Sequence, residues 1–99
     1  MELPCLFHGK RVLLNEHALR RLRERRISAS DVCRVFEKYT LECVNSKTRL
    51  RVLVEEESGV AVVFKEHAGL IEVVTVFKGM KGKKLLSRLL RGRWVCTRR

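Results

Sequence analysis

Hydrophobic residues recur every three or four positions in two stretches of the first part of the chain, and this spacing predicts two consecutive helices. The first stretch, residues 16–26, follows Asn15, whose side chain can cap a helix, and its apolar face holds Ala18, Leu19 and Leu22. The second, about residues 29–38, starts after Ser28, which with Asp31 matches a capping box, and its apolar face holds Val32, Val35 and Phe36. The short break between them predicts a helical hairpin.

After Thr40 the hydrophobic period changes to two, which is typical of strands. Three runs, from Arg49 to Val54, from Val60 to Glu66 and from Leu70 to Lys78, are separated by short polar turns and favour an antiparallel meander. Residues 40–44 either add a fourth strand or extend the loop. In the last run, strict alternation predicts one face made of Ile71, Val73, Thr75 and Phe77.

Two more apolar segments complete the predicted order. A short strand is predicted before the helices at residues 12–14, and residues 83–91 look helical through Leu85, Leu86, Leu89 and Leu90. The result is an α+β fold in one domain, residues 1–99: strand, helix, helix, an antiparallel meander of three or four strands, and a short C-terminal helix. The two helices are expected on one sheet face, as a two-layer sandwich. Apolar residues on the other face, which are Leu53, Val63, Val74 and Val76, need cover from the terminal helix or from a second subunit in a homodimer.

Positive charge is the strongest compositional feature. Lys and Arg outnumber Asp and Glu by 22 to 11, which gives a formal net charge of +11. Such an excess repels itself, and binding to a polyanion relieves that repulsion. From Lys78 to Arg99 no acid occurs, so the basic C-terminal segment, residues 79–99, is expected to follow a phosphate backbone. The charge favours nucleic acid as partner, then an acidic protein, then an anionic membrane surface; a solvated basic surface is the alternative.

The four cysteines, Cys5, Cys33, Cys43 and Cys96, have no C-x-x-C spacing, so a zinc site is not expected. In a reducing cytosol they would be small buried hydrophobes, whereas the scarcity of Asn and Gln hints at a thermophile, in which an intracellular disulfide becomes an option. The first seven residues lack the features of a secretory signal, and the apolar runs are too short for a membrane span. A cytoplasmic protein without a membrane partner is therefore expected.

One block of the first helix region reads His17-Ala18-x-x-Arg21-x-x-x-Arg25-Arg26-Ile27-Ser28-x-x-Asp31-Val32. It resembles the pattern H-A-x-x-R-x-x-x-R-G-I-S-x-x-D-V of a small branch of the RelE/ParE-like toxins. The late strand Val73-Val74-Thr75-Val76-Phe77 is similar to the V-x-T-V-Y strand of that branch. Arg26 stands where the branch prefers Gly, at the left-handed residue that ends the first helix, and Phe77 replaces the usual Tyr.

The resemblance implies a growth-inhibiting toxin that binds RNA, either free or as ribosome-bound mRNA, and that is neutralised by an acidic antitoxin. Its first functional interpretation is an mRNA interferase, an endoribonuclease that needs no metal or other cofactor because the substrate's own 2′-hydroxyl attacks. A non-catalytic basic RNA-binding module is the second interpretation. A ParE-like toxin that inhibits DNA gyrase is the third.

His17, Arg21 and Arg25 are the candidate catalytic residues, because their spacing of four places them in one stripe along the first helix. The arginines can hold a phosphate and stabilise its transition state, while His17 can accept or donate a proton. The structural alternative is that His17 packs beside the sheet and that Arg21 pairs with Glu24 or Glu37.

Further cations are candidates for RNA binding on the sheet and in the C-terminal segment: Arg49, Arg51, Lys65, Lys78, Lys81, Lys83, Lys84, Arg88 and Arg91. Arg51 and Lys65 share a sheet face if the hairpin register is simple. His67, in a turn, is expected to be solvated rather than catalytic. Trp94 either stacks on a base or anchors the terminal segment to the core.

Overall fold

Ten elements follow one another in the computed structural model, which describes residues 1–99. They are β1 (Glu2–Phe7), β2 (Lys10–Leu14), α1 (Glu16–Glu24), α2 (Ala29–Lys38), β3 (Leu41–Asn45), β4 (Arg51–Glu55), β5 (Val60–Glu66), β6 (Leu70–Phe77), α3 (Gly82–Leu90) and β7 (Trp94–Arg98). The α+β class and the three helices are confirmed. The number of strands is larger than predicted.

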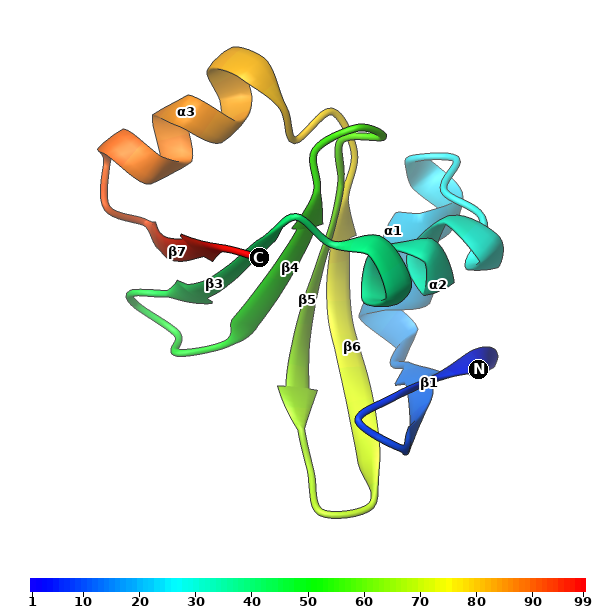
Figure 1. The fold of residues 1–99 in the computed structure, drawn as a ribbon. Coiled ribbons are helices and arrows are strands. Elements are labelled where there is room, and N and C mark those ends of the chain that lie inside the picture. Colours follow the sequence, from blue (N-terminus) through cyan, green and yellow to red (C-terminus); the bar gives the residue numbers. More distant parts are fainter.

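A single sheet of seven strands runs in the order β1-β2-β6-β5-β4-β3-β7 (Figure 1). β3 to β6 form the antiparallel meander that the period-two pattern predicts, and residues 41–45 are its fourth strand. β2 lies parallel to β6 at the end of the meander, and the other pairings are antiparallel. The predicted meander therefore corresponds to the four central strands β3 to β6, and it leaves out the strands at the edges of the sheet.

The two edge strands were not predicted. β1 is joined to β2 by His8 and Gly9, which have φ angles of +53° and +73°, as in a two-residue hairpin turn. Pro4 interrupts the β1 pattern, and proline is tolerated there because β1 is an edge strand. β7 follows α3 and pairs with β3, so the end of the basic segment belongs to the sheet.

Each face of the sheet has its own core. α1 and α2 cover one face and share with it a cluster of 16 buried residues that includes Phe36, Phe64 and Val73. α3 covers part of the opposite face, where nine buried residues include Met80, Leu85 and, from the edge strand β7, Trp94. The terminal helix therefore covers part of the second face, which is the first of the two alternatives proposed. Val63 and Val74 lie on this face as predicted, but the prediction for Leu53 is wrong: it is buried under α1 and α2, because Val52 and Val54, on the other side of β4, face α3.

β6 contains a bulge that changes the predicted faces. The register runs from Val63 opposite Thr75 to Phe64 opposite Val73, so β6 has one extra residue at this point. As a result Val76 lies in the core under α1 and α2 with Val73, while Phe77 packs against the core under α3. The predictions that Phe77 shares the face of Val73, and that Val76 belongs to the second face, are wrong because strict alternation ignores the inserted residue.

The helix boundaries follow the capping residues. Asn15 Oδ1 accepts a hydrogen bond from the Ala18 amide at 2.9 Å, and Ser28 with Asp31 forms the complete capping box. α1 ends at Glu24, two residues before the predicted end, and Arg26 has a φ of +53°. The left-handed conformation predicted at Arg26 is confirmed.

All four cysteines form disulfides. Cys5 of β1 is bonded to Cys33 of α2, and Cys43 of β3 to Cys96 of β7. Of the two alternatives for the cysteines, the structure therefore has the bonded one. Each bond ties an edge strand to the rest of the fold.

Candidate nucleic-acid interface

Many cations of this chain have no acidic partner. The acids form ion pairs with one group of cations, which are Lys10, Arg11, Arg21, Arg34, Arg51 and Arg98. Between Lys78 and Arg93 no cation makes such a pair, and no acid occurs there in the sequence. An unbroken run of cations without acidic partners therefore surrounds α3 and its two ends.

Between the β3–β4 turn and the C-terminal end of α3 lies a pocket of about 470 Å³. No acidic or hydrophobic side chain lines this basic pocket, whose residues are Asn45, Ser46, Lys47, Thr48, Arg88, Arg91, Gly92 and Arg93. Four of these residues are cations. A concave site with four cations and no acid attracts anions.

The walls of the basic pocket are held together without using its cations. The Ser46 hydroxyl donates to the Gly92 carbonyl at 2.7 Å, and the Ser46 amide donates to the Arg93 carbonyl at 2.9 Å. On the turn side, Asn45 Oδ1 accepts hydrogen bonds from the amides of Lys47 and Thr48. The backbone and the neutral side chains fix the shape, so the cations stay free for a ligand.

Arg88 is the most constrained of the pocket cations. Its guanidinium carbon lies 4.8 Å from the ring centroid of Phe77 and 4.9 Å from that of Trp94. Partial burial, followed by the nearby guanidiniums of Arg93 and Arg25, lowers the pKa of Arg88 below its usual range. A phosphate would supply the negative charge that this group of arginines lacks.

Arg25 brings α1 to the same place. Its guanidinium donates to the Val76 carbonyl and lies 4.9 Å from the ring centroid of Phe77. Arg25 and Arg88, which come from helices on opposite faces of the sheet, therefore meet at one aromatic ring. Of the three candidate catalytic residues, only Arg25 reaches the basic surface around α3 through such a contact.

His17 and Arg21 do not join this group. His17 is exposed and makes no hydrogen bond within the protein, and eight residues along a helix separate it from Arg25 by about 12 Å. Arg21 donates to Glu24 at 2.8 Å, which is one of the two structural pairings considered for it. A catalytic role for the α1 stripe stays a prediction.

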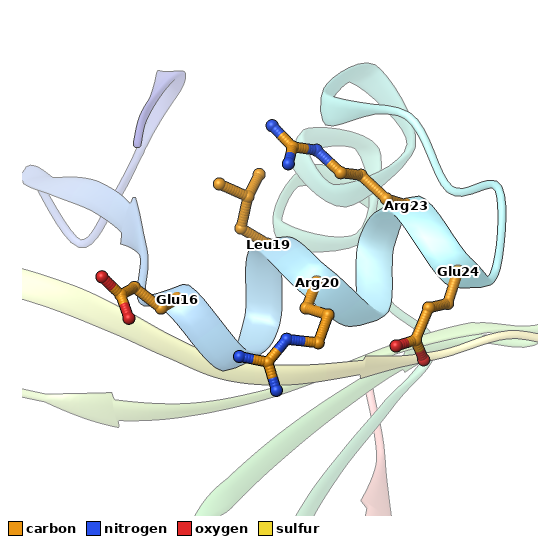
Figure 2. A pocket seen from close by; sticks show the side chains of 5 residues that line it. All are labelled: Glu16, Leu19, Arg20, Arg23 and Glu24. Atoms are coloured by element: carbon orange, nitrogen blue, oxygen red, sulfur yellow. The ribbon is translucent and has the colours of Figure 1, made fainter.

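A depression of about 330 Å³ lies along another face of α1. Figure 2 shows Arg20 and Glu24 projecting from one side of the helix and Leu19 and Arg23 from the other. Glu16 and Glu24 take part in this lining, so the two arginines are balanced by two acids. This depression does not favour a polyanion as the basic pocket does.

The candidate cations on the sheet do not converge on one site. Arg51 pairs with Glu42 and Glu66, and it lies opposite Phe64 in the register. Lys65, the next residue after Phe64, therefore points to the other face, where it is paired in register with Glu72. The expectation that Arg51 and Lys65 share a face is wrong. It needs Arg51 opposite Lys65, whereas in the structure Arg51 lies opposite Phe64, one residue earlier in β5.

The other predicted RNA-binding residues are exposed, except for the half-buried Arg88. Arg49 lies in the β3–β4 turn with a φ of +65°, and Lys78 follows β6. Lys81, Lys83 and Lys84 lie at the N-terminal end of α3, away from the basic pocket, whereas Arg88 and Arg91 line it. Trp94 is only 2 % exposed, so it anchors β7 and cannot stack on a base.

No protein-family model matches the chain, and neither a curated protein nor a solved structure matches it. None of the three helices is long and apolar enough to cross a membrane. No group of three or more His, Cys, Asp or Glu side chains is placed to hold a metal ion. The geometry of the basic pocket is therefore the main support for a functional proposal.

Two pocket cations, Lys47 and Arg93, were missed in the sequence. Lys47 lies in a polar turn that separates two strands, and such turns are ordinarily solvated. Arg93 lies in the basic C-terminal segment, for which the sequence predicts only a general affinity for phosphates. In the sequence, the only sign of a role for Lys47 is that it lies in the same turn as Arg49. Its position next to α3 depends on the pairing of β7 with β3, which the sequence does not indicate.

Proposed function

We propose that this protein binds RNA and that the basic pocket is where an RNA phosphate binds. The observation that carries the proposal is the group Lys47, Arg88, Arg91 and Arg93 around one concave site without an acid. Arginine side chains contact phosphate oxygens through two parallel hydrogen bonds, and lysine adds a point charge. The net charge of +11 adds a long-range attraction for any polyanion.

Single-stranded RNA fits this surface better than duplex DNA does. A pocket of about 470 Å³ is sized for a single nucleotide, and single strands present splayed nucleotides to such pockets. A duplex reader commonly inserts a polar helix into the major groove. The free face of α3 instead exposes Leu86 and Leu90, which offer no hydrogen bonds to base edges.

A toxin role goes with this proposal through the resemblance of the α1 motif to the RelE/ParE-like toxins. The proposed toxin role also implies a RelE/ParE-like arrangement of the fold, neutralisation by an acidic antitoxin and a cytoplasmic location. The two disulfides restrict the proposed cytoplasmic location to hyperthermophiles, because stable disulfides are rare in the cytoplasm of other organisms. Growth arrest on expression would support a toxin, and normal growth would support a plain RNA-binding module.

Fluorescence anisotropy with a labelled single-stranded RNA, a matched DNA strand and a DNA duplex tests the binding proposal. The wild type is expected to bind the RNA most tightly, with an affinity that falls steeply as salt rises. Arg91→Glu and Arg93→Glu each reverse one charge of the basic pocket. Each is expected to weaken RNA binding and to reduce the slope of log affinity against log salt by at least about 1.

Arg20→Glu is the matched control, because it makes the same change in net charge on α1 outside the basic pocket. It is expected to weaken binding much less than the two pocket variants do. An equal loss in all three variants would mean that only total charge matters. No binding of RNA at low salt would overturn the proposal.

A further inference from the structure

The end of α3 gathers three cations of the basic pocket. The Gly92 amide donates to the Leu89 carbonyl at 3.1 Å, and Gly92 has a φ of +67°. The Arg93 amide donates to the Arg88 carbonyl, also at 3.1 Å. This is a Schellman ending, in which a left-handed glycine reverses the chain directly after the helix. The reversal brings Arg93 back beside Arg88 and Arg91 of the last helical turn, and all three line the pocket.

The two walls of the basic pocket, the β3–β4 turn and the loop from α3 to β7, lie side by side and touch each other (Figure 1). At this contact the Ser46 hydroxyl donates to the Gly92 carbonyl at 2.7 Å, and the Ser46 amide donates to the Arg93 carbonyl at 2.9 Å. These hydrogen bonds occupy both carbonyls, and no chain can pass between the walls here. The middle of a strand would need room for two flanking nucleotides at the open side, whereas the end of a strand needs room for one. The pocket therefore favours the end of a strand.

The neutral side chains of the basic pocket add hydrogen-bond donors. Asn45 Oδ1 accepts from the amides of Lys47 and Thr48 at 2.9 and 3.0 Å, which leaves its Nδ2 group without a partner in the protein. The Thr48 hydroxyl accepts from the Leu50 amide at 3.2 Å and keeps its hydrogen for a further acceptor. Together with the four cations, these groups present donors to whatever enters the pocket.

The helix dipole of α3 accounts for only part of the charge in the basic pocket. The C-terminal end of a helix carries about half a negative elementary charge, which a single cation in the last turn offsets. The pocket has four cations and no acid. One of them, Lys47, comes from the opposite wall and does not belong to the helix at all. The remaining positive charge therefore calls for an anion of more than one charge.

A terminal phosphate matches this excess of charge and donors better than a phosphate inside a strand does. An internal phosphodiester has a single negative charge and offers two free oxygens. A phosphate monoester has a charge of about −1.5 to −2 near pH 7 and offers three strong acceptor oxygens. Each further oxygen can accept charge-assisted hydrogen bonds from arginine or lysine.

We propose that the basic pocket recognises the terminal phosphate monoester of an RNA strand, which rests on the RNA binding proposed above. The phosphate lies between the two walls, where Lys47 of the turn faces the arginines of the other wall. The pocket volume of about 470 Å³ has room for the terminal nucleotide, and the rest of the strand leaves through the open side. The ligand class is thus RNA with a phosphorylated 5′ or 3′ end, and not single strands in general.

Binding of the full-length protein to four RNAs, each labelled on an internal base, tests the proposal. Three have one sequence and carry a 5′-phosphate, a 3′-phosphate or two hydroxyl ends. The fourth has hydroxyl ends and is two nucleotides longer, so its total charge is about that of the phosphorylated RNAs. At least one phosphorylated RNA is expected to bind about 10-fold or more tightly than both hydroxyl-ended RNAs, as one further hydrogen bond to a charged group provides. The RNA that binds most tightly identifies the recognised end.

Two variants of the β3–β4 turn place the preference in the pocket. Lys47→Gln removes a pocket cation, and Arg49→Gln is the matched control, because Arg49 belongs to the same turn but does not line the pocket. Both side chains are exposed and make no hydrogen bond in the protein, so both variants are expected to fold. Lys47→Gln is expected to lower the preference for the phosphorylated RNA by about 3-fold or more. Arg49→Gln is expected to weaken the binding of all four RNAs by a similar factor and to keep the preference.

Three outcomes would contradict the terminal-phosphate site. Equal affinity for the phosphorylated RNAs and the longer RNA would overturn it and leave the RNA-binding proposal standing. A preference that Lys47→Gln leaves unchanged, or that Arg49→Gln lowers equally, would also overturn it, because the phosphate would then bind outside the pocket. Absence of RNA binding would remove both proposals.

Discussion

Arg26 ends α1 in a backbone conformation that glycine adopts more readily than any other residue. Its φ is +53°, and the amides of Arg26 and Ile27 donate to the carbonyls of Arg23 at 3.3 Å and Leu22 at 2.9 Å. These two hydrogen bonds are those of a Schellman ending, in which the left-handed residue is usually glycine. A residue with a Cβ pays about 1–2 kcal/mol in this conformation.

Arg26→Gly is therefore expected to stabilise the fold. The variant removes the steric cost of about 1–2 kcal/mol, and the greater freedom of glycine in the unfolded chain offsets about 0.5–1 kcal/mol of it. Arg26 is exposed and has no acidic partner, so no ion pair is lost. The net gain is about 0.5–1 kcal/mol, which corresponds to a rise of a few degrees in Tm for a domain of this size.

Urea unfolding with the disulfides intact measures this gain, and Arg26→Ala is the control. The alanine variant removes the same charge and keeps the Cβ, so it is expected to leave the free energy of unfolding nearly unchanged. Equal stabilisation by glycine and alanine would assign the effect to charge repulsion on a chain of net charge +11. A glycine variant less stable than the wild type would refute the argument from backbone conformation.

Two further predictions concern the caps and the cross-links. The hydrogen bond from the Ser28 amide is the main cause that lowers the pKa of Asp31, so the stabilisation by this carboxylate is present above its unfolded pKa and lost as pH falls through the folded one. Asp31→Asn is expected to destabilise the protein at neutral pH and much less at pH 2 to 3, as urea unfolding at both pH values would show, and a constant difference would contradict it. The unfolded, unreduced protein is expected to contain no reactive thiol, and replacing both Cys43 and Cys96 with Ser is expected to cost about 2–4 kcal/mol in urea unfolding. Reactive thiols in the unreduced sample, or an unchanged free energy of unfolding, would contradict the Cys43–Cys96 bond.

The elements that are encoded locally were predictable. Asn15 and the Ser28–Asp31 capping box mark the starts of both helices, and each is a short-range side-chain signal. The meander could be predicted because its strands pair with their neighbours in the chain. The positive φ at Arg26 was predictable from the glycine that the resemblance prefers there.

The elements that depend on distant pairing were not predictable. β7 pairs with β3 across about half the chain, and Cys43 lies directly opposite Cys96 in that register. No local pattern distinguishes this arrangement from a basic tail. The basic pocket was missed for the same reason, since one wall is the β3–β4 turn and the other is the end of α3.

A single inserted residue in β6 allows Arg25, at the end of α1, and Arg88 of α3 to contact the same aromatic ring. With strict alternation Phe77 would face α1 and α2 beside Val73, out of reach of α3. The bulge instead turns Phe77 to the α3 side, where Arg88 and Arg25 both lie within 4.9 Å of its ring centroid. Val73, Val74, Thr75 and Val76 are all good strand formers, so nothing in their hydrophobicity marks the insertion. The bulge falls inside the five residues that resemble the V-x-T-V-Y strand, and this motif therefore carries a backbone irregularity that bears directly on the proposed RNA surface.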